Sequence, residues 1–161
     1  MKTWMCGAVA LGAVVVSTGA AVAGEVSVAR GAQVAITSGC HDCHTAGYAE
    51  SGGKIDPAAS LKGTGLGWQG PWGTTYPANL RLVAKDKGSE DAFLQYAKTF
   101  QAKPPMPFMN VHAMDESDIR SLYQYIVSLG EPGAPVPEYV PPGQEPKTPY
   151  IVIAPPIMPK G

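Results

Sequence analysis

Cysteine and histidine are scarce in this sequence. Among its 161 residues there are three cysteines and three histidines. A structural zinc site needs four ligands and usually a second Cys/His pair at a short spacing. Outside residues 40–44, however, the sequence offers only Cys6 and His112. The composition therefore argues against a zinc site.

The sequence also lacks an excess of charge, an alternating apolar pattern and a catalytic constellation. Its 12 basic and 13 acidic residues leave a formal net charge of −1, which argues against nucleic-acid binding and provides no basic patch for a membrane surface. No alternating pattern of useful length predicts a strand, so a thioredoxin-like βαβ unit is not expected. Because no nucleophile and general base stand in a recognisable arrangement, we do not expect an enzyme.

An apolar stretch lies near the N-terminus. Lys2 precedes an apolar run over residues 4–16, and an Ala-x-Ala cleavage site follows at residues 21–23. This order predicts a cleaved signal peptide over residues 1–23 and export, which we expect to be to the periplasm. The run is interrupted by glycines and is too short for a stable transmembrane helix; an uncleaved anchor is the alternative. Cleavage would remove Cys6 and leave two cysteines.

Those two cysteines belong to a pentapeptide with a specific chemistry, Cys40-His41-Asp42-Cys43-His44. Two cysteines separated by two residues, with histidine directly after the second, form the attachment signature of c-type haem. Both thiols can add to the two haem vinyl groups, because the short spacer lets one turn of backbone reach both. His44 then lies under the iron as proximal ligand. We therefore predict one covalently attached haem c, bound through Cys40 and Cys43, with His44 on the iron.

Three helices are predicted within residues 24–130, which we assign to one domain. Ser89 is the predicted N-cap of the second helix, and Asp115 with Asp118 has the spacing of a capping box at the start of the third. Apolar residues at helical spacing support each segment. The three helices are predicted at about residues 26–39, 89–101 and 115–129.

A long loop rich in glycine and proline joins the first two helices, from Thr45 to Gly88. So long a loop would normally count against a compact domain. A haem resolves the difficulty, because the macrocycle itself is a core around which such a loop can wrap. The loop also contains aromatic residues that offer flat apolar surface for the haem and ring donors for its propionates. These residues are Trp68, Trp72 and Tyr76, and ordinary core packing is the alternative role for each.

The composition changes after residue 130. Ten of the 16 prolines follow that position, so residues 131–161 are not expected to form a helix or a central strand. Large apolar residues at 139–140 and 150–153 favour a tail that packs on the domain, since a freely solvated linker has little use for them. An arm that docks a partner is the alternative.

These features together resemble a monohaem class I c-type cytochrome. The resemblance depends on the helix leading into the haem motif, on Pro104-Pro105-Met106-Pro107 and on the apolar pattern of the last helix. It covers about residues 26–130 and implies an all-α, class I cytochrome c-like fold, with helices and long loops wrapped around one haem. More narrowly, the stretch Gly73 to Leu80 is similar to cytochrome c domains of bacterial membrane-bound alcohol and sugar-acid dehydrogenase systems.

The resemblance also implies a methionine as the sixth iron ligand, and Met106 matches the family's position. Met114 is the main alternative; Met109, His112 or an open site are the others, and Met158 completes the set of candidate methionines. His/Met ligation implies an electron carrier between periplasmic or membrane-associated redox partners. An open distal site would instead permit peroxidase-like or gas-sensing activity. A third hypothesis is a non-catalytic haem subunit of a dehydrogenase or oxidase complex.

Overall fold

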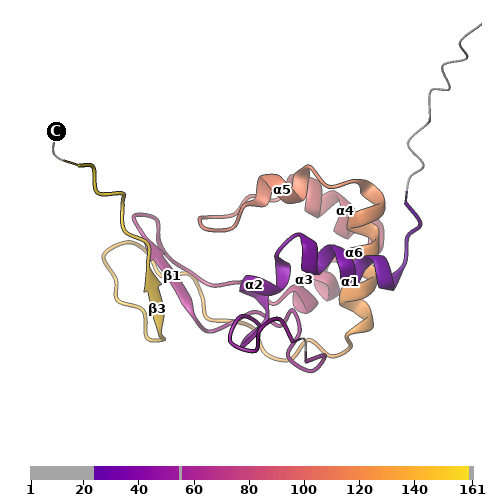
Figure 1. The fold of residues 1–161 in the computed structure, drawn as a ribbon, viewed down its shortest axis with the longest axis horizontal. Helices are drawn as coiled ribbons and strands as arrows, with labels where there is room; N and C mark the ends of the chain where they lie inside the picture. Colours follow the sequence, from indigo (N-terminus) through magenta and orange to yellow (C-terminus); the bar gives the residue numbers. More distant parts are fainter. Residues whose placement is uncertain (1–23, 55, 160–161) are drawn as a thin grey trace, which may run out of the picture.

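The computed structural model describes residues 24–54 and 56–159, so the predicted signal peptide lies outside the described residues. Within them the chain forms six helices and three short strands (Figure 1). No helix in this part of the chain is long and apolar enough to cross a membrane. In chain order the elements are α1 Val28–Thr37, α2 Cys40–His44, β1 Gly67–Gly70, β2 Gly73–Thr75, α3 Leu80–Lys87, α4 Glu90–Thr99, α5 Phe108–His112, α6 Glu116–Ser128 and β3 Tyr150–Val152.

The helix starts follow from capping residues. Ser89 caps α4 as predicted, because its side chain accepts a hydrogen bond from the Ala92 N–H. Asp115 occupies the N-cap position of α6, but its side chain makes no capping bond. The predicted capping box is therefore wrong. The carboxylate of Asp118 instead accepts a hydrogen bond from Arg30 Nε at 2.5 Å and so links α6 to α1.

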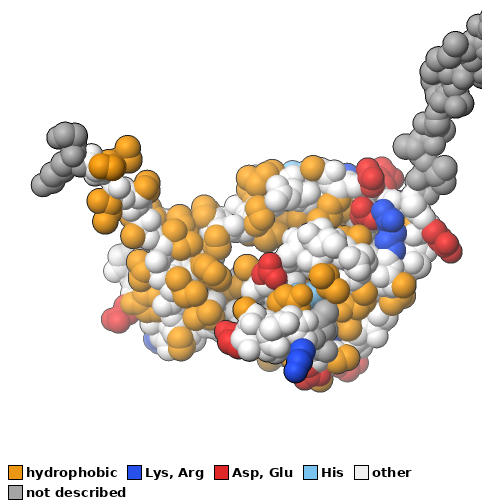
Figure 2. Space-filling view, in the orientation of Figure 1, with side chains coloured by type: hydrophobic (Ala, Val, Ile, Leu, Met, Phe, Trp, Pro, Cys, Tyr) orange, Lys and Arg blue, Asp and Glu red, His pale blue; other side chains and the backbone are white. Residues whose placement is uncertain are grey.

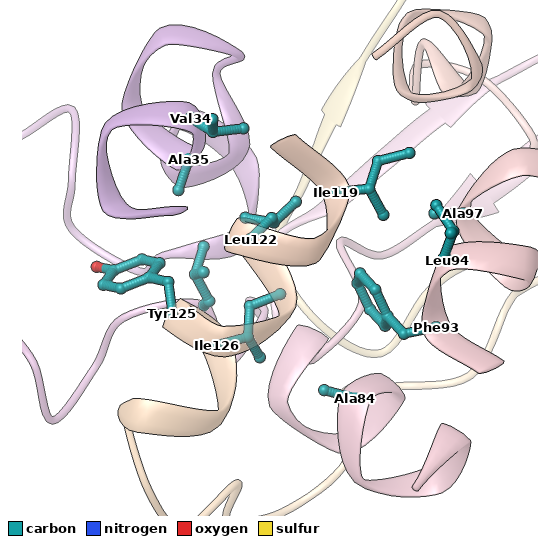
Figure 3. Close-up of a cluster of buried hydrophobic side chains, with 11 residues drawn as sticks. Val34, Ala35, Ala84, Phe93, Leu94, Ala97, Ile119, Leu122, Tyr125 and Ile126 are labelled. Atoms are coloured by element: carbon teal, nitrogen blue, oxygen red, sulfur yellow. The ribbon is translucent and has the colours of Figure 1, made fainter. Parts of the chain in front are cut away.

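The core lies where α1, α3 and α4 pack against α6. Gly31 makes the contact between α1 and α6 very close: a Cβ atom at this position would lie 1.9 Å from the backbone oxygen of Ser121. Any larger residue would force the two helices apart. Figure 3 shows the apolar side chains that meet around α6. The buried cluster comprises Val34, Ala35, Leu61, Ala84, Phe93, Leu94, Ala97, Ile119, Leu122, Tyr125 and Ile126.

The molecule is mostly helical, but it also contains a small sheet that the all-α prediction did not include. The strand order is β2-β1-β3, with β1 antiparallel to β2 and parallel to β3. Trp68 is opposite Thr75 on one side and Ile151 on the other. Each strand has only three or four residues, too few for an alternating apolar pattern to be recognised in the sequence.

The C-terminal tail runs back along the chain and supplies β3 as an edge strand, a position that its prolines permit. Asn79 Nδ2 donates to the carbonyls of Pro132 and Ala134 at 2.8 and 3.1 Å. Further along, the Tyr76 hydroxyl and Thr148 Oγ1 are 2.8 Å apart. Hydrophobic side chains gather over the lobe that contains β1 and β3 (Figure 2). The exposed ones from the tail are Tyr139, Tyr150, Ile151, Val152, Ile157 and Met158.

Candidate haem site

The Cys-x-x-Cys-His motif forms a helix of its own, α2, which consists of those five residues. Gly39 precedes it in the left-handed region, at φ +70°, so that the chain turns sharply between α1 and α2. Residues three and four apart lie on the same face of a helix. The helix therefore places the Cys40 and Cys43 side chains next to each other, with His44 beside them, and both thiols are free.

A hydrogen bond from the imidazole ring of His44 to a backbone carbonyl holds this side chain in one orientation. The imidazole is 7% exposed, and its Nδ1 lies 2.7 Å from the carbonyl oxygen of Ala78. A carbonyl oxygen only accepts, so Nδ1 carries the proton and Nε2 has a free lone pair. Burial lowers the pKa of His44 and favours the neutral ring. A neutral imidazole whose other nitrogen donates to a backbone carbonyl is the usual form of a metal-ligating histidine.

The backbone of His44 is anchored as well. Its carbonyl oxygen accepts a hydrogen bond from the Gly63 N–H at 2.8 Å. Gly63 has φ +75°, and a Cβ atom there would lie 2.5 Å from the Pro77 oxygen and from a methyl group of Val136. Only glycine fits this position, because both the conformation and the space exclude a side chain.

His41, the second residue of the motif, has a different role. It is fully buried, its Nδ1 lies 2.8 Å from Thr45 Oγ1, and its ring stacks on Tyr48. The same Thr45 oxygen accepts a hydrogen bond from the Leu61 N–H. His41 Nε2 is buried and has no partner among the described residues. The residue therefore fixes α2 to the loop that follows it.

The two thiols are in an environment that keeps them protonated. Burial raises the pKa of Cys40 to about 11, and burial also raises the pKa of Cys43. Among the described residues, moreover, no group of three or more His, Cys, Asp or Glu side chains could hold a metal ion. The described residues therefore do not bring together the four ligands of a structural zinc site.

The candidates for the sixth ligand have distinct environments. Met106 is half-buried in the loop before α5. Met114 packs against the core cluster, whereas Met109 and Met158 are 56% and 78% exposed. His112 Nε2 lies 2.9 Å from the Phe100 carbonyl, so one of its ring nitrogens is already bonded. Met106, His112 and Met114 are all half-buried, so burial alone does not choose among these three.

Residues 28–130 match the sequence model of the family described as Cytochrome c. The chain belongs to the cytochrome c family. No curated protein and no solved structure gave a match to the chain. The family transfers electrons through haem, and the cofactor of this cytochrome is covalently attached haem c with its iron. Two adjacent reduced thiols and an oriented neutral imidazole are a donor set that fits this cofactor.

One residue of the cytochrome that sequence reasoning missed is Arg81. It is 4% exposed, and its guanidinium donates to backbone carbonyls rather than to a carboxylate. Its partners are Ser60 at 2.8 Å, Leu129 at 2.7 Å, Glu131 at 3.3 Å and Pro57. Arg81 therefore connects the loop after α2, the end of α6 and the start of the tail. Because all its partners are backbone atoms, no pattern of side chains in the sequence indicates this role.

The aromatic residues expected around the haem differ in their surroundings. The Tyr76 hydroxyl is engaged with Thr148 of the tail. The Trp72 ring packs over Gly70 in its own turn, since a Cβ atom there would lie 2.4 Å from the indole. Trp72 Nε1 is buried and has no acceptor among the described residues. A propionate as its acceptor stays a prediction.

Proposed function

We propose that this cytochrome carries single electrons through one haem c that is attached to Cys40 and Cys43 and ligated by His44 and Met106. The observation that carries the proposal is the orientation of His44: a buried neutral imidazole, with Nδ1 bonded to the Ala78 carbonyl, at the end of the one-turn helix that contains both thiols. This is the arrangement that a proximal ligand of a covalent haem needs.

The haem iron supplies the one-electron chemistry when bound, and the protein residues determine its access and orientation. The Ala78 carbonyl and the Gly63 N–H prevent the His44 ring from rotating or moving away. Met106 would supply the second protein ligand of the iron, so that no coordination position would remain for a substrate. The half-buried position of Met106 in the loop before α5 supports this role.

The predicted signal peptide supports export to the periplasm, where redox proteins are the expected partners of a cytochrome c. We further propose kinship with the cytochrome domains of bacterial alcohol and sugar-acid dehydrogenase systems. Its support is the stretch Gly73 to Leu80, whose residues form β2, the carbonyl that orients His44 and the N-cap of α3. The division into signal peptide, residues 24–130 and tail is part of this proposal. The bonds of Asn79 to Pro132 and Ala134 support a tail that packs on the domain.

Paired substitutions of two methionines test the ligand assignment. Met106→Ala should abolish the methionine-to-iron charge-transfer band of the oxidised protein and allow added cyanide to bind quickly. Met114→Ala is the matched control, because Met114 packs against the core but is only partly buried; it should keep the band and cost less than the roughly 2–5 kcal/mol expected for a fully buried methionine.

If the two outcomes are exchanged, Met114 is the ligand. If the wild-type protein has no such band and binds cyanide at once, the distal site is open and the alternative of peroxidase-like or gas-sensing chemistry gains support. Either result would overturn the proposed ligation.

A further inference from the structure

The C-terminal tail is joined to the hairpin of β1 and β2 by specific backbone contacts. Val140 and Thr74 exchange two hydrogen bonds, at 2.8 and 3.0 Å. Gly73 allows this approach: it has φ +97°, and a Cβ atom there would lie 2.3 Å from the Val140 oxygen. The position of the preceding tail residue, Tyr139, is thereby fixed relative to the hairpin.

Tyr139 contacts both the hairpin and the loop that contains Met106. Its hydroxyl donates to the Trp72 carbonyl at 2.6 Å. The ammonium group of Lys103 lies over the Tyr139 ring, 4.9 Å from its centroid, which is within the range of a cation–π contact. Lys103 is three residues before Met106. The tail therefore reaches the segment that carries the proposed ligand.

The hairpin holds the next residue of the same loop. Thr75 Oγ1 donates to the Pro104 carbonyl at 2.8 Å. Register partners have their side chains on the same face of a sheet, so Trp68 and Ile151 share the face of Thr75. The sheet face that contacts the loop carrying Met106 therefore includes a residue of the tail, Ile151.

The loop has few other attachments near its tip. At its base, His112 bonds the Phe100 carbonyl, and the rings of Phe100 and Phe108 meet edge to face. Between these two phenylalanines, the three prolines and Lys103 are exposed. In Figure 1 the segment before α5 extends away from the helices, toward the lobe that contains β1 and β3. Within the described part of the chain, the polar contacts that join this stretch of the loop to other segments are those of Lys103 and Pro104.

We propose that Tyr139 is a positioning residue for the sixth ligand, and that the tail holds Met106 on the iron by fixing the loop at Lys103, next to the Pro104 carbonyl that Thr75 of the hairpin holds. This inference rests on the proposed ligation by Met106. An added ligand reaches the iron only from the minor state in which the methionine has left it, so its rate of binding reports the population of that state. Removing a contact that exists only in the closed loop must raise this population.

The test is the rate at which cyanide binds to the oxidised, full-length holoprotein, recorded together with the methionine charge-transfer band. Lys103→Gln should raise the rate about two- to fivefold, the amount expected for an exposed cation–π contact. Tyr139→Ala should raise it at least as much, and the double variant should add little to Tyr139→Ala, because both changes remove the same contact. Tyr139→Phe keeps the ring and should have the smallest effect.

Two controls separate positioning from general destabilisation. Ile157→Ala changes a tail residue that is 95% exposed and should leave the rate unchanged. Ser121→Ala removes the acceptor of the Ser27 N–H between α6 and the start of α1, so it should lower the melting temperature without faster cyanide binding.

The outcomes distinguish the two proposals. If Met106→Ala loses the band but Tyr139→Ala and Lys103→Gln bind cyanide at the wild-type rate, the role of the tail is overturned and the ligand stands. If Ser121→Ala accelerates binding as much as Tyr139→Ala does, the effect is global and the positioning role is also overturned. If Met106→Ala keeps the band, the ligand assignment fails, and the inference about Tyr139 fails with it.

Discussion

Asn79 joins three parts of the structure, and its substitution gives the sharpest prediction about the fold. The residue is 3% exposed and directly follows Ala78, whose carbonyl orients His44. Its side-chain oxygen accepts hydrogen bonds from the N–H groups of Arg81 and Leu82 and so caps α3. Its side-chain nitrogen donates to two carbonyls of the tail, those of Pro132 and Ala134.

The two functions can be separated by two substitutions. Asn79→Ser keeps an oxygen that can cap α3 but loses both bonds to the tail, at about 0.5–1.5 kcal/mol each, so we expect a loss of about 1–3 kcal/mol. Asn79→Ala loses the cap as well, which costs about 1 kcal/mol more. The expected total for Asn79→Ala is therefore about 2–4 kcal/mol.

Denaturant unfolding of the oxidised holoprotein, followed by circular dichroism, measures both losses. The slope of the unfolding free energy against denaturant should be unchanged, so that the shift in midpoint reports stability alone. Equal stability of Asn79→Ser and wild type would show that the tail bonds contribute nothing. Equal stability of Asn79→Ser and Asn79→Ala would refute the capping role.

Three further predictions concern the core and the cofactor. Gly31→Ala should lower the free energy of unfolding by at least about 2 kcal/mol, because the new Cβ would overlap the Ser121 oxygen; a thermal melt within error of wild type would contradict the close contact of α1 and α6. Arg81→Met should cost about 1–3 kcal/mol, because the buried Ser60 carbonyl and the half-buried Leu129 carbonyl lose their donor, and limited proteolysis should then cleave the chain near residue 131. A Cys40→Ala, Cys43→Ala double variant should retain no haem after denaturation and acid extraction, whereas haem that stays attached would disprove the attachment sites.

The Gly73 to Leu80 stretch illustrates how a short motif can serve several structural purposes. The absence of a side chain at Gly73 leaves room for the tail, and Thr75 donates a hydrogen bond to the loop that carries Met106. The Ala78 carbonyl orients His44, and Asn79 caps α3. Each of these uses depends on a backbone position or on a single polar atom rather than on a buried apolar side chain. Substitutions in this stretch are therefore expected to affect the haem environment more than the hydrophobic core.

The sequence by itself determined the chemistry of the site and the main helices. The Cys-x-x-Cys-His spacing needs no tertiary information, because one helical turn places both thiols and the histidine together. Helices near the predicted positions, the Ser89 cap and burial of Ile119, Leu122 and Ile126 followed from local periodicity and capping rules. The cytochrome c family match over residues 28–130 agrees with that interpretation.

Only the tertiary structure decided what the long loop and the tail do. The tail supplies the third strand of the sheet, and pairing between segments more than 70 residues apart leaves no periodic signal in strands of three or four residues. The predicted loop also contains α3, and here the helix prediction overlooked two local signals, the N-cap Asn79 and Gly88 at the other end. Arg81 was missed because its acceptors are carbonyls, which every residue has. The capping box did not form because the Asp118 carboxylate accepts a hydrogen bond from Arg30, which lies on another helix. Local rules describe residues that are neighbours in the chain, whereas the contacts of Asp118, Arg81 and the tail join residues that are neighbours only in space.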